Sequence, residues 1–195
     1  MRHFFNPFLK MAGWHALIYG IIAMAATIFL AAHYNVHLDG ILEMHINGKV
    51  PLHLALFQTG INWLTLVLVF GIASLILNPS GFRLLDLLGI MAFVRVPFIV
   101  LPPLHAVIDI SVIADKIRES VLNGSQNLML NATEYAIFGV YLLITTLFII
   151  LSVTWMYNGF RLLSHSKGIR ANIIFIISLL IGLIISELAI NQLPF

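Results

Sequence analysis

The chain has 195 residues, of which 61% are hydrophobic and 9% are charged, and its mean hydropathy is +1.02. These values lie far outside the range of soluble domains and predict a single membrane-embedded domain over residues 1–195. The formal net charge of +2 is too small to indicate a nucleic-acid-binding surface. The absence of cysteine excludes disulfides, thiol catalysis and thiolate metal sites.

A short basic head, MRHFFNPFLK, precedes an apolar run that is long enough to span a bilayer. No small-residue cleavage site follows this run, so we interpret residues 14–32 as a first span rather than as a removed signal peptide. Gly13 and Gly20 are expected to let helices pack closely. Further apolar segments predict spans at about 56–77, 87–107, 136–156 and 173–190. The sequence therefore predicts an all-α integral membrane protein with five transmembrane helices.

Between the first two spans, a period-two pattern indicates a β-hairpin on the outer side of the membrane. Apolar and polar residues alternate over residues 42–46 and again over residues 50–54, on either side of Asn47-Gly48. Asn-Gly favours the type I′ turn of a two-residue hairpin, because this turn needs positive φ at both central positions. Pro51 predicts that the second strand is an edge strand.

The third span carries the least expected residues of the chain. Arg95 lies inside the apolar stretch 84–109, and Pro97, Pro102 and Pro103 follow it. A guanidinium within the bilayer costs about 3 kcal/mol or more, so it normally faces protein or water. The prolines bend or break the helix and free backbone carbonyls that Arg95 can satisfy. We favour this capping role over the alternative, in which Arg95 binds an anion or a lipid headgroup.

An interfacial helix is expected between the third and fourth spans, on the outer side. The apolar residues Ile110, Ile113, Ile117 and Val121 recur at helical spacing, with charged residues on the other side. Such an amphipathic helix lies in the plane of the membrane surface.

The distribution of basic residues predicts the orientation of the chain. With the N-terminus inside, the inner segments carry Arg2, Lys10, Arg83, Arg161, Lys167 and Arg170, and the outer segments carry Lys49, Lys116 and Arg118. This bias follows the positive-inside rule. We therefore expect a cytoplasmic N-terminus and a C-terminus outside.

A polar layer is expected in the outer half of the membrane. Counted along the spans, His105, Glu187 and Asn62 fall at similar depth, and Asn191 lies slightly further out. With Arg95, these residues form a candidate intramembrane polar site. A Glu187–His105 pair would relay a proton or hold a cation. We favour the alternative, in which Glu187 is protonated or pairs structurally and locks the third span to the fifth.

The loop between the first two spans offers weaker candidates for metal binding. The possible ligands are His33, His37, Asp39, Glu43, His45 and His53. His33 and His37 are four residues apart, a spacing that zinc sites on helices often use. No HExxH pattern occurs, and the sequence does not fix the geometry of the hairpin. A metal site, and the membrane metalloenzyme that it would imply, therefore ranks below the other hypotheses, and we expect no cofactor.

Several short motifs together resemble a known family. They are Asn6-Pro7-Phe8, Asn78-Pro79-Ser80-Gly81 followed by Arg83-Leu84-Leu85-Asp86, Arg95 with Pro97-Phe98, and Tyr157-Asn158-Gly159-Phe160-Arg161 leading to Gly168. These motifs resemble the Yip family of five-span membrane proteins, named for interaction with small Ypt/Rab GTPases. Eukaryotic members have a long cytosolic segment before the first span, whereas about a dozen residues precede it here, so we do not expect GTPase binding. The short form is similar to bacterial members, which implies the inner membrane of a bacterium.

The leading functional hypothesis is non-enzymatic. It is a Yip-like membrane-organising or scaffolding protein that binds lipids, other membrane proteins or further copies of itself through the bent third span. The alternative is a small transporter or permeation subunit that uses Arg95, His105 and Glu187. This alternative is weakened because the sequence shows neither an internal repeat nor a second broken span. Nucleic acid is not expected as a partner.

Overall fold

The computed structural model describes residues 2–11, 13–46, 48–78, 80–108, 110–122 and 130–192. Within these residues, five helical segments are long and apolar enough to cross a membrane. They are α2 (Trp14–Tyr34), α3 (Leu52–Leu77), the segment Leu84–Ile108, α7 (Ala132–Ser164) and α8 (Ile169–Asn191). This confirms the all-α class and the five apolar helices that the sequence predicts, and it is compatible with an integral membrane protein.

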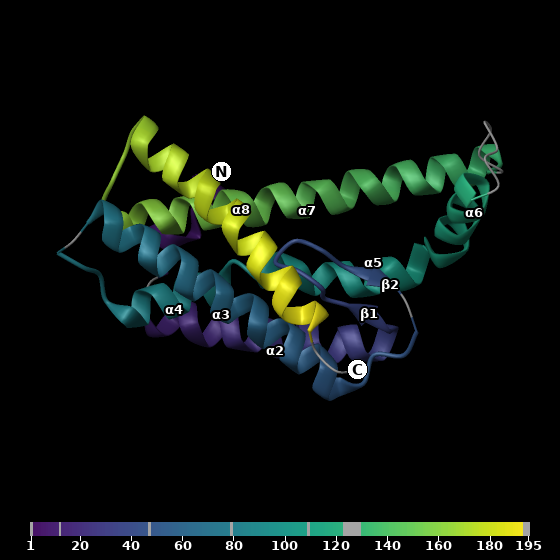
Figure 1. Cartoon of the computed structure of the whole chain (residues 1–195), viewed down its shortest axis with the longest axis horizontal. Helices are drawn as coiled ribbons and strands as arrows, with labels where there is room; N and C mark the ends of the chain where they lie inside the picture. Colours follow the sequence, from purple (N-terminus) through teal and green to yellow (C-terminus); the bar gives the residue numbers. More distant parts are fainter. Residues whose placement is uncertain are drawn as a thin grey trace.

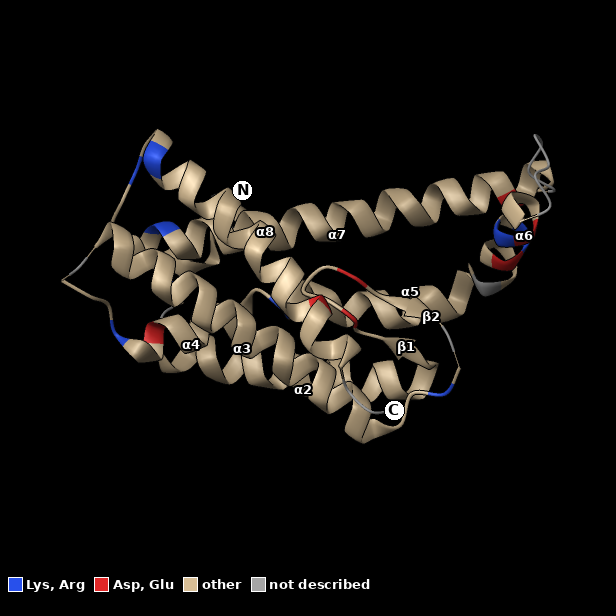
Figure 2. Ribbon diagram, in the orientation of Figure 1, with Lys and Arg blue, Asp and Glu red and all other residues tan. Residues whose placement is uncertain are grey.

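The long helices form one bundle, in which α2 packs on α3 and on α4 (Leu84–Phe93), and α8 packs on α3 (Figure 1). α7 runs along the bundle and extends beyond it to α6 (Ile110–Leu122), and it is longer than the predicted span 136–156 at both ends. Figure 2 shows that most charged residues gather near the ends of the bundle and on α6, leaving the long helices almost uncharged. This distribution is the one that apolar spans require.

Two short N-terminal elements, α1 (Arg2–Phe5) and η1 (Pro7–Leu9), precede the first long helix. Side chains of α7 form hydrogen bonds with the backbone carbonyls of α1. Trp155 Nε1 donates a hydrogen bond to the Phe4 carbonyl at 2.8 Å, and Asn158 Nδ2 donates to the Phe5 carbonyl at 2.8 Å. Phe8 is buried in the main core. These contacts fix the N-terminal segment to the fourth apolar helix.

At the crossing of α2 with α4 (Leu84–Phe93), here called the tight crossing, the two helix backbones approach each other closely. A Cβ atom added to Gly20 would lie 2.5 Å from Ala92 Cβ, and one added to Gly89 would lie 2.8 Å from the Gly13 carbonyl oxygen. Ala16 is fully buried on the same face of α2. Small residues at this spacing let two helix backbones approach each other, as the sequence predicts for Gly20. Gly13 is instead the N-cap of α2 with φ 56°, and a Cβ atom there would approach no side chain closer than 3.5 Å.

The third apolar segment is broken, as the prolines predict. α4 ends at Phe93, a 3₁₀ helix η2 covers Val96–Val100, and α5 covers Leu101–Ile108. Pro97 lies in the first turn of η2, where its missing N–H removes no helical hydrogen bond. Both η2 and α5 still pack on α2, and Arg95 lies at the break as the N-cap of η2.

The predicted hairpin is wrong in its pairing. β1 (Val36–His37) pairs with β2 (His45–Ile46) in an antiparallel two-stranded sheet, so residues 42–46 contribute a strand but residues 50–54 do not. Pro51 is the N-cap of α3 rather than an edge-strand residue, since its fixed φ suits the start of a helix. Asn47, in the predicted turn, and Pro79, in the loop after α3, lie outside the described residues.

The segment before β1 explains why the chain turns there. α2 ends at Tyr34 because Asn35 adopts the left-handed conformation (φ 55°), which ends helices. The Asn35 Oδ1 atom accepts a hydrogen bond from the Val50 N–H at 3.2 Å. One side chain therefore ties the beginning of the α2–α3 connection to its end.

The predicted amphipathic helix is present as α6 (Ile110–Leu122). Ile110, Ile113 and Ile117 pack with Tyr141 of α7, whereas Val121 is exposed. Asn131, the N-cap of α7, forms a capping box with Glu134. Glu134 also forms an ion pair with Lys116 of α6, so the ends of the two helices are joined.

Candidate functional site

The connection between β1 and β2 is irregular in backbone yet partly buried among the apolar helices. We call residues 38–44 the sheet loop. Leu38 and Ile41 are fully buried, and a Cβ atom added to Gly182, inside α8, would lie 3.1 Å from Ile41. Irregular backbone among membrane spans is tolerated only where protein or water satisfies its polar groups. The buried backbone groups of this loop therefore need hydrogen-bond partners from the surrounding helices.

Three polar side chains from two apolar segments hold the sheet loop. Gln58 Oε1 accepts a hydrogen bond from the Leu38 N–H at 3.0 Å, and Asn62 Nδ2 donates to the Leu38 carbonyl at 2.9 Å. Arg95 Nη1 donates to the Ile41 carbonyl at 2.5 Å. The loop thus replaces the hydrogen bonds of regular secondary structure with side-chain partners, and both polar groups of Leu38 are satisfied.

This arrangement corrects the predicted role of Arg95. Its guanidinium bonds the Ile41 carbonyl on another segment instead of the carbonyls loosened by Pro97. The guanidinium also lies over the ring of Phe98, with 4.1 Å between Cζ and the ring centroid. A buried guanidinium is stabilised by this combination of an acceptor and an aromatic face. Arg95 is 1% exposed and is an anchor of the loop.

The structure brings together only part of the predicted polar layer. Asn62 and Arg95 meet at the sheet loop, but His105 faces α7, where the Tyr141 hydroxyl lies 2.9 Å from its Nδ1 atom. Glu187 and Asn191 are exposed on α8. Among the described residues, no hydrogen bond or ion pair joins Glu187 to His105. Equal depth does not produce contact here, because α8 packs on α3 while α5 packs on α7.

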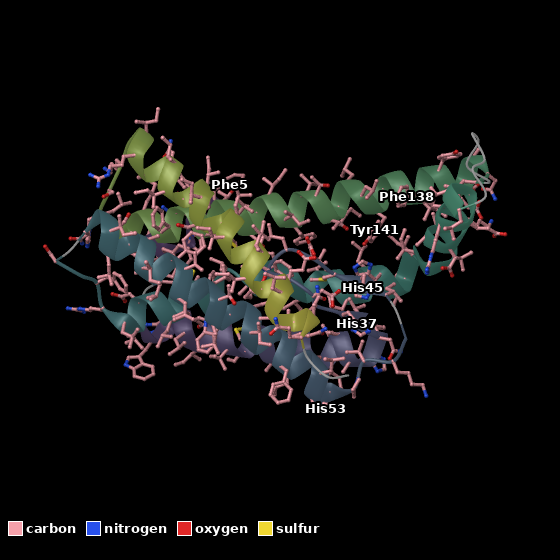
Figure 3. All side chains as sticks on the ribbon, viewed as in Figure 1. Phe5, His37, His45, His53, Phe138 and Tyr141 are labelled. Atoms are coloured by element: carbon pink, nitrogen blue, oxygen red, sulfur yellow. The ribbon has the colours of Figure 1, made fainter. Side chains whose placement is uncertain are left out.

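Three of the predicted metal ligands converge at the sheet. His37 and His45 are directly opposed across the two strands, and their rings are stacked with centroids 4.8 Å apart. His45 Nδ1 contacts Asp39 Oδ2. One ligand atom from each of the three residues lies within 4.8 Å of the other two. Figure 3 shows His37 and His45 side by side, with His53 away from them.

The remaining predicted ligands lie outside this cluster. His33 stacks on Phe29, with an edge contact to Tyr34, at the end of α2. His53 belongs to the first turn of α3, because the second predicted strand is in fact a helix. Glu43 packs against Gly40 and lines a cavity beside the cluster. The helical spacing of His33 and His37 brings no site together, since the helix ends between them.

Two neighbouring cavities open beside the sheet loop. One of about 400 Å³ lies between the loop, α5 and α7, and one of about 490 Å³ lies between β2, α6 and α7. His45, His105 and Tyr141 line both. Sequence reasoning did not find Tyr141, which sits in an apolar helix with no distinguishing pattern.

The charged residues that line these cavities are acidic. Asp39 and Glu43 line the first cavity, Asp115 lines the second, and no lysine or arginine among the described residues lines either one. Carboxylates and imidazoles in a cleft with apolar walls favour a positively charged ligand. An anionic ligand would lack a basic partner there.

A scan against protein-family models and searches of curated proteins and of solved structures give no match to this chain. The Yip-like motifs therefore remain a resemblance, and membership of that family stays a prediction.

Proposed function

We propose that this chain is a non-enzymatic, multi-pass membrane protein that organises the membrane by binding lipids whose headgroups carry an amine. The observation that supports this is the acidic lining of the two cavities. Glu43 and Asp115 are exposed carboxylates at their walls, and an ammonium group is the complementary charge.

The surroundings of the cavities suit a lipid. Leu101 and Ile149 line the first cavity and Phe138 lines the second, so apolar side chains stand next to the acidic ones. A lipid has a matching arrangement, because its charged headgroup is attached to apolar acyl chains. The amphipathic helix α6 borders the second cavity, in keeping with a position near the membrane surface.

We further propose that this end of the bundle faces outward from a bacterial inner membrane, with the N-terminus in the cytoplasm. The six-to-three distribution of basic residues supports the orientation. The Yip-like motifs agree with a membrane-organising role. No observation favours the transporter alternative, because Arg95 and His105 are engaged by Ile41 and Tyr141 while Glu187 is exposed on α8.

Native mass spectrometry of the detergent-purified chain tests lipid binding. Phosphatidylethanolamine and phosphatidylglycerol with the same acyl chains are added in turn. The wild type is expected to retain phosphatidylethanolamine in preference, and the double variant Glu43→Gln/Asp115→Asn is expected to lose at least about tenfold in affinity, or about 1.4 kcal/mol.

The matched control is Glu187→Gln, which neutralises an exposed carboxylate away from both cavities. It is expected to bind lipid like the wild type. Equal retention of the two lipids by the wild type, or an equal loss in the control, would contradict the proposal.

A further inference from the structure

We infer that His37, Asp39 and His45 hold a divalent transition-metal ion at the base of the sheet loop, with zinc as the appropriate probe. Their ligand atoms already lie within 4.8 Å of one another. In a tetrahedral zinc site, bonds of about 2.0–2.1 Å place ligand atoms about 3.3 Å apart. Side-chain rotations that change the separations of the ligand atoms by up to about 1.5 Å would give the tetrahedral spacing.

The local fold explains why these three residues meet. His37 and His45 are a cross-strand pair, which places two side chains on the same face of a sheet. Asp39 lies in the sheet loop, two residues after His37, and its Oδ2 atom contacts His45 Nδ1. Leu38, between them, points the other way into the core, where Gln58 and Asn62 hold its backbone. The ligand arrangement thus follows from the pairing of His37 with His45 and from a fixed loop.

The donor set selects the class of metal. Two imidazoles and one carboxylate suit zinc and its neighbours among the transition metals, whereas calcium and magnesium prefer oxygen ligands only. Three protein ligands leave a fourth position for water or for another donor. Glu43 lines the adjoining cavity and could supply that donor.

Gln58 provides the outer support that metal ligands commonly have. Its Nε2 atom lies 3.5 Å from His37 Nδ1 and donates a hydrogen bond to Asp39 Oδ1 at 3.3 Å. Such second contacts orient the ligands, and their loss typically lowers metal affinity by about 10–100-fold. Gln58 is 2% exposed, so it presents a fixed amide to the cluster.

This inference rests on a different observation from the lipid proposal, the convergence of three ligand atoms, although Asp39, Glu43 and His45 also line the first cavity. The competing explanation is that the Asp39–His45 contact is an ordinary ion pair beside a stacked histidine. An ion pair of this kind needs no metal and contributes little, since His45 is exposed. The two explanations differ in whether the purified chain binds zinc tightly and in a fixed ratio.

The test is zinc titration of the full chain in detergent, purified without a polyhistidine tag and stripped with a chelator. Isothermal calorimetry gives affinity and stoichiometry, and cobalt substitution reports ligand geometry through its visible absorption. We expect one zinc ion per chain, with at least about a 100-fold loss of affinity in His45→Ala and in His37→Ala, since loss of a direct ligand exceeds loss of an outer contact.

His33→Ala and His53→Ala are matched controls, because both histidines lie near the same end of the bundle but outside the cluster. They are expected to bind zinc like the wild type. Absence of stoichiometric zinc in the wild type, or an equal loss in these controls, overturns the inference. Retention of phosphatidylethanolamine in a chain that binds no zinc would overturn the metal site alone, and failure of both titrations would overturn both proposals.

Discussion

The tight crossing and the sheet loop lie in the same bundle but are held together by opposite means. At the crossing, α2 and α4 already satisfy their own backbones, so only shape matters, and Gly20 and Gly89 remove the side chains that would separate them. In the sheet loop the backbone is irregular, so Gln58, Asn62 and Arg95 supply the missing hydrogen bonds. The first contact is therefore sensitive to volume, and the second to polarity.

The largest effect is expected from Gly20→Leu at the tight crossing. Its Cβ atom alone would lie 2.5 Å from Ala92 Cβ and 2.6 Å from the Phe93 backbone nitrogen, so the two helices must separate. Overpacking of a core typically costs about 1–3 kcal/mol, and a clash with backbone falls at or above that range. Size-exclusion chromatography in detergent should show loss of the monodisperse protein.

Gly139→Leu is the control for this experiment. Gly139 is also a helical glycine, but a Cβ atom there meets nothing within 4 Å. It should behave like the wild type. If both variants eluted alike, close backbone approach at the crossing would not be what holds α2 to α4.

The next effect is expected from Arg95→Met, which keeps an apolar stem but removes the donor to the Ile41 carbonyl. A buried acceptor without a partner costs about 1–3 kcal/mol, although removal of the buried charge offsets part of this. We therefore expect a modest fall in thermal midpoint with a large, local rise in hydrogen exchange over residues 38–44. Unchanged protection of that loop would show that Arg95 is not its anchor.

The two regions also differ in how far the sequence predicts them. Gly20 marks a close helix contact, and Pro97 marks the broken third segment, because each effect is local. The bonds of the sheet loop join residues that are 20 to 54 positions apart, such as Leu38 with Gln58 and Ile41 with Arg95. No local pattern specifies which main-chain group a buried polar side chain will meet.

The sheet loop was not predicted, because the local pattern around Asn47-Gly48 favours a different strand pairing. Asn47-Gly48 predicts a hairpin, and the alternation after it agrees, but the pairing of His37 with His45 and the helix that begins at Leu52 prevail. The sequence shows that this loop is rich in possible metal ligands, but it does not show that His37, Asp39 and His45 are the three that meet. Counting depth along spans failed for Glu187 in the same way, because it carries no information about which helices are neighbours.

A smaller quantity is the coupling between two anchors, which is measured by combining Asn62→Ala with Arg95→Met. Each substitution removes one anchor of the same loop, and each leaves one buried carbonyl without its donor. If the loop detaches as a unit, the double variant should lose less stability than the sum of the single variants, by about 0.5 kcal/mol or more. Additive losses, measured by chemical or thermal unfolding in detergent, would mean that the two anchors act separately.

The smallest effects are expected outside both regions, where helix ends meet at the surface. Asn131→Ala removes the capping box of α7 and should cost about 1 kcal/mol. Lys116→Met removes the ion pair with Glu134, which is partly exposed, and should cost less than about 0.5 kcal/mol. Thermal unfolding that ranked Lys116→Met above Asn131→Ala would reverse this order.

The bond between Arg95 and the Ile41 carbonyl has a consequence for biogenesis. A ribosome makes the chain from its N-terminus, so the acceptor on the sheet loop leaves the ribosome 54 residues before the donor. When the third span leaves the translocon, the first two spans can already present a carbonyl to its guanidinium. With this order of the spans, Arg95 has a hydrogen-bond acceptor available when it enters the membrane. A permuted chain in which the third span came first should therefore insert less efficiently.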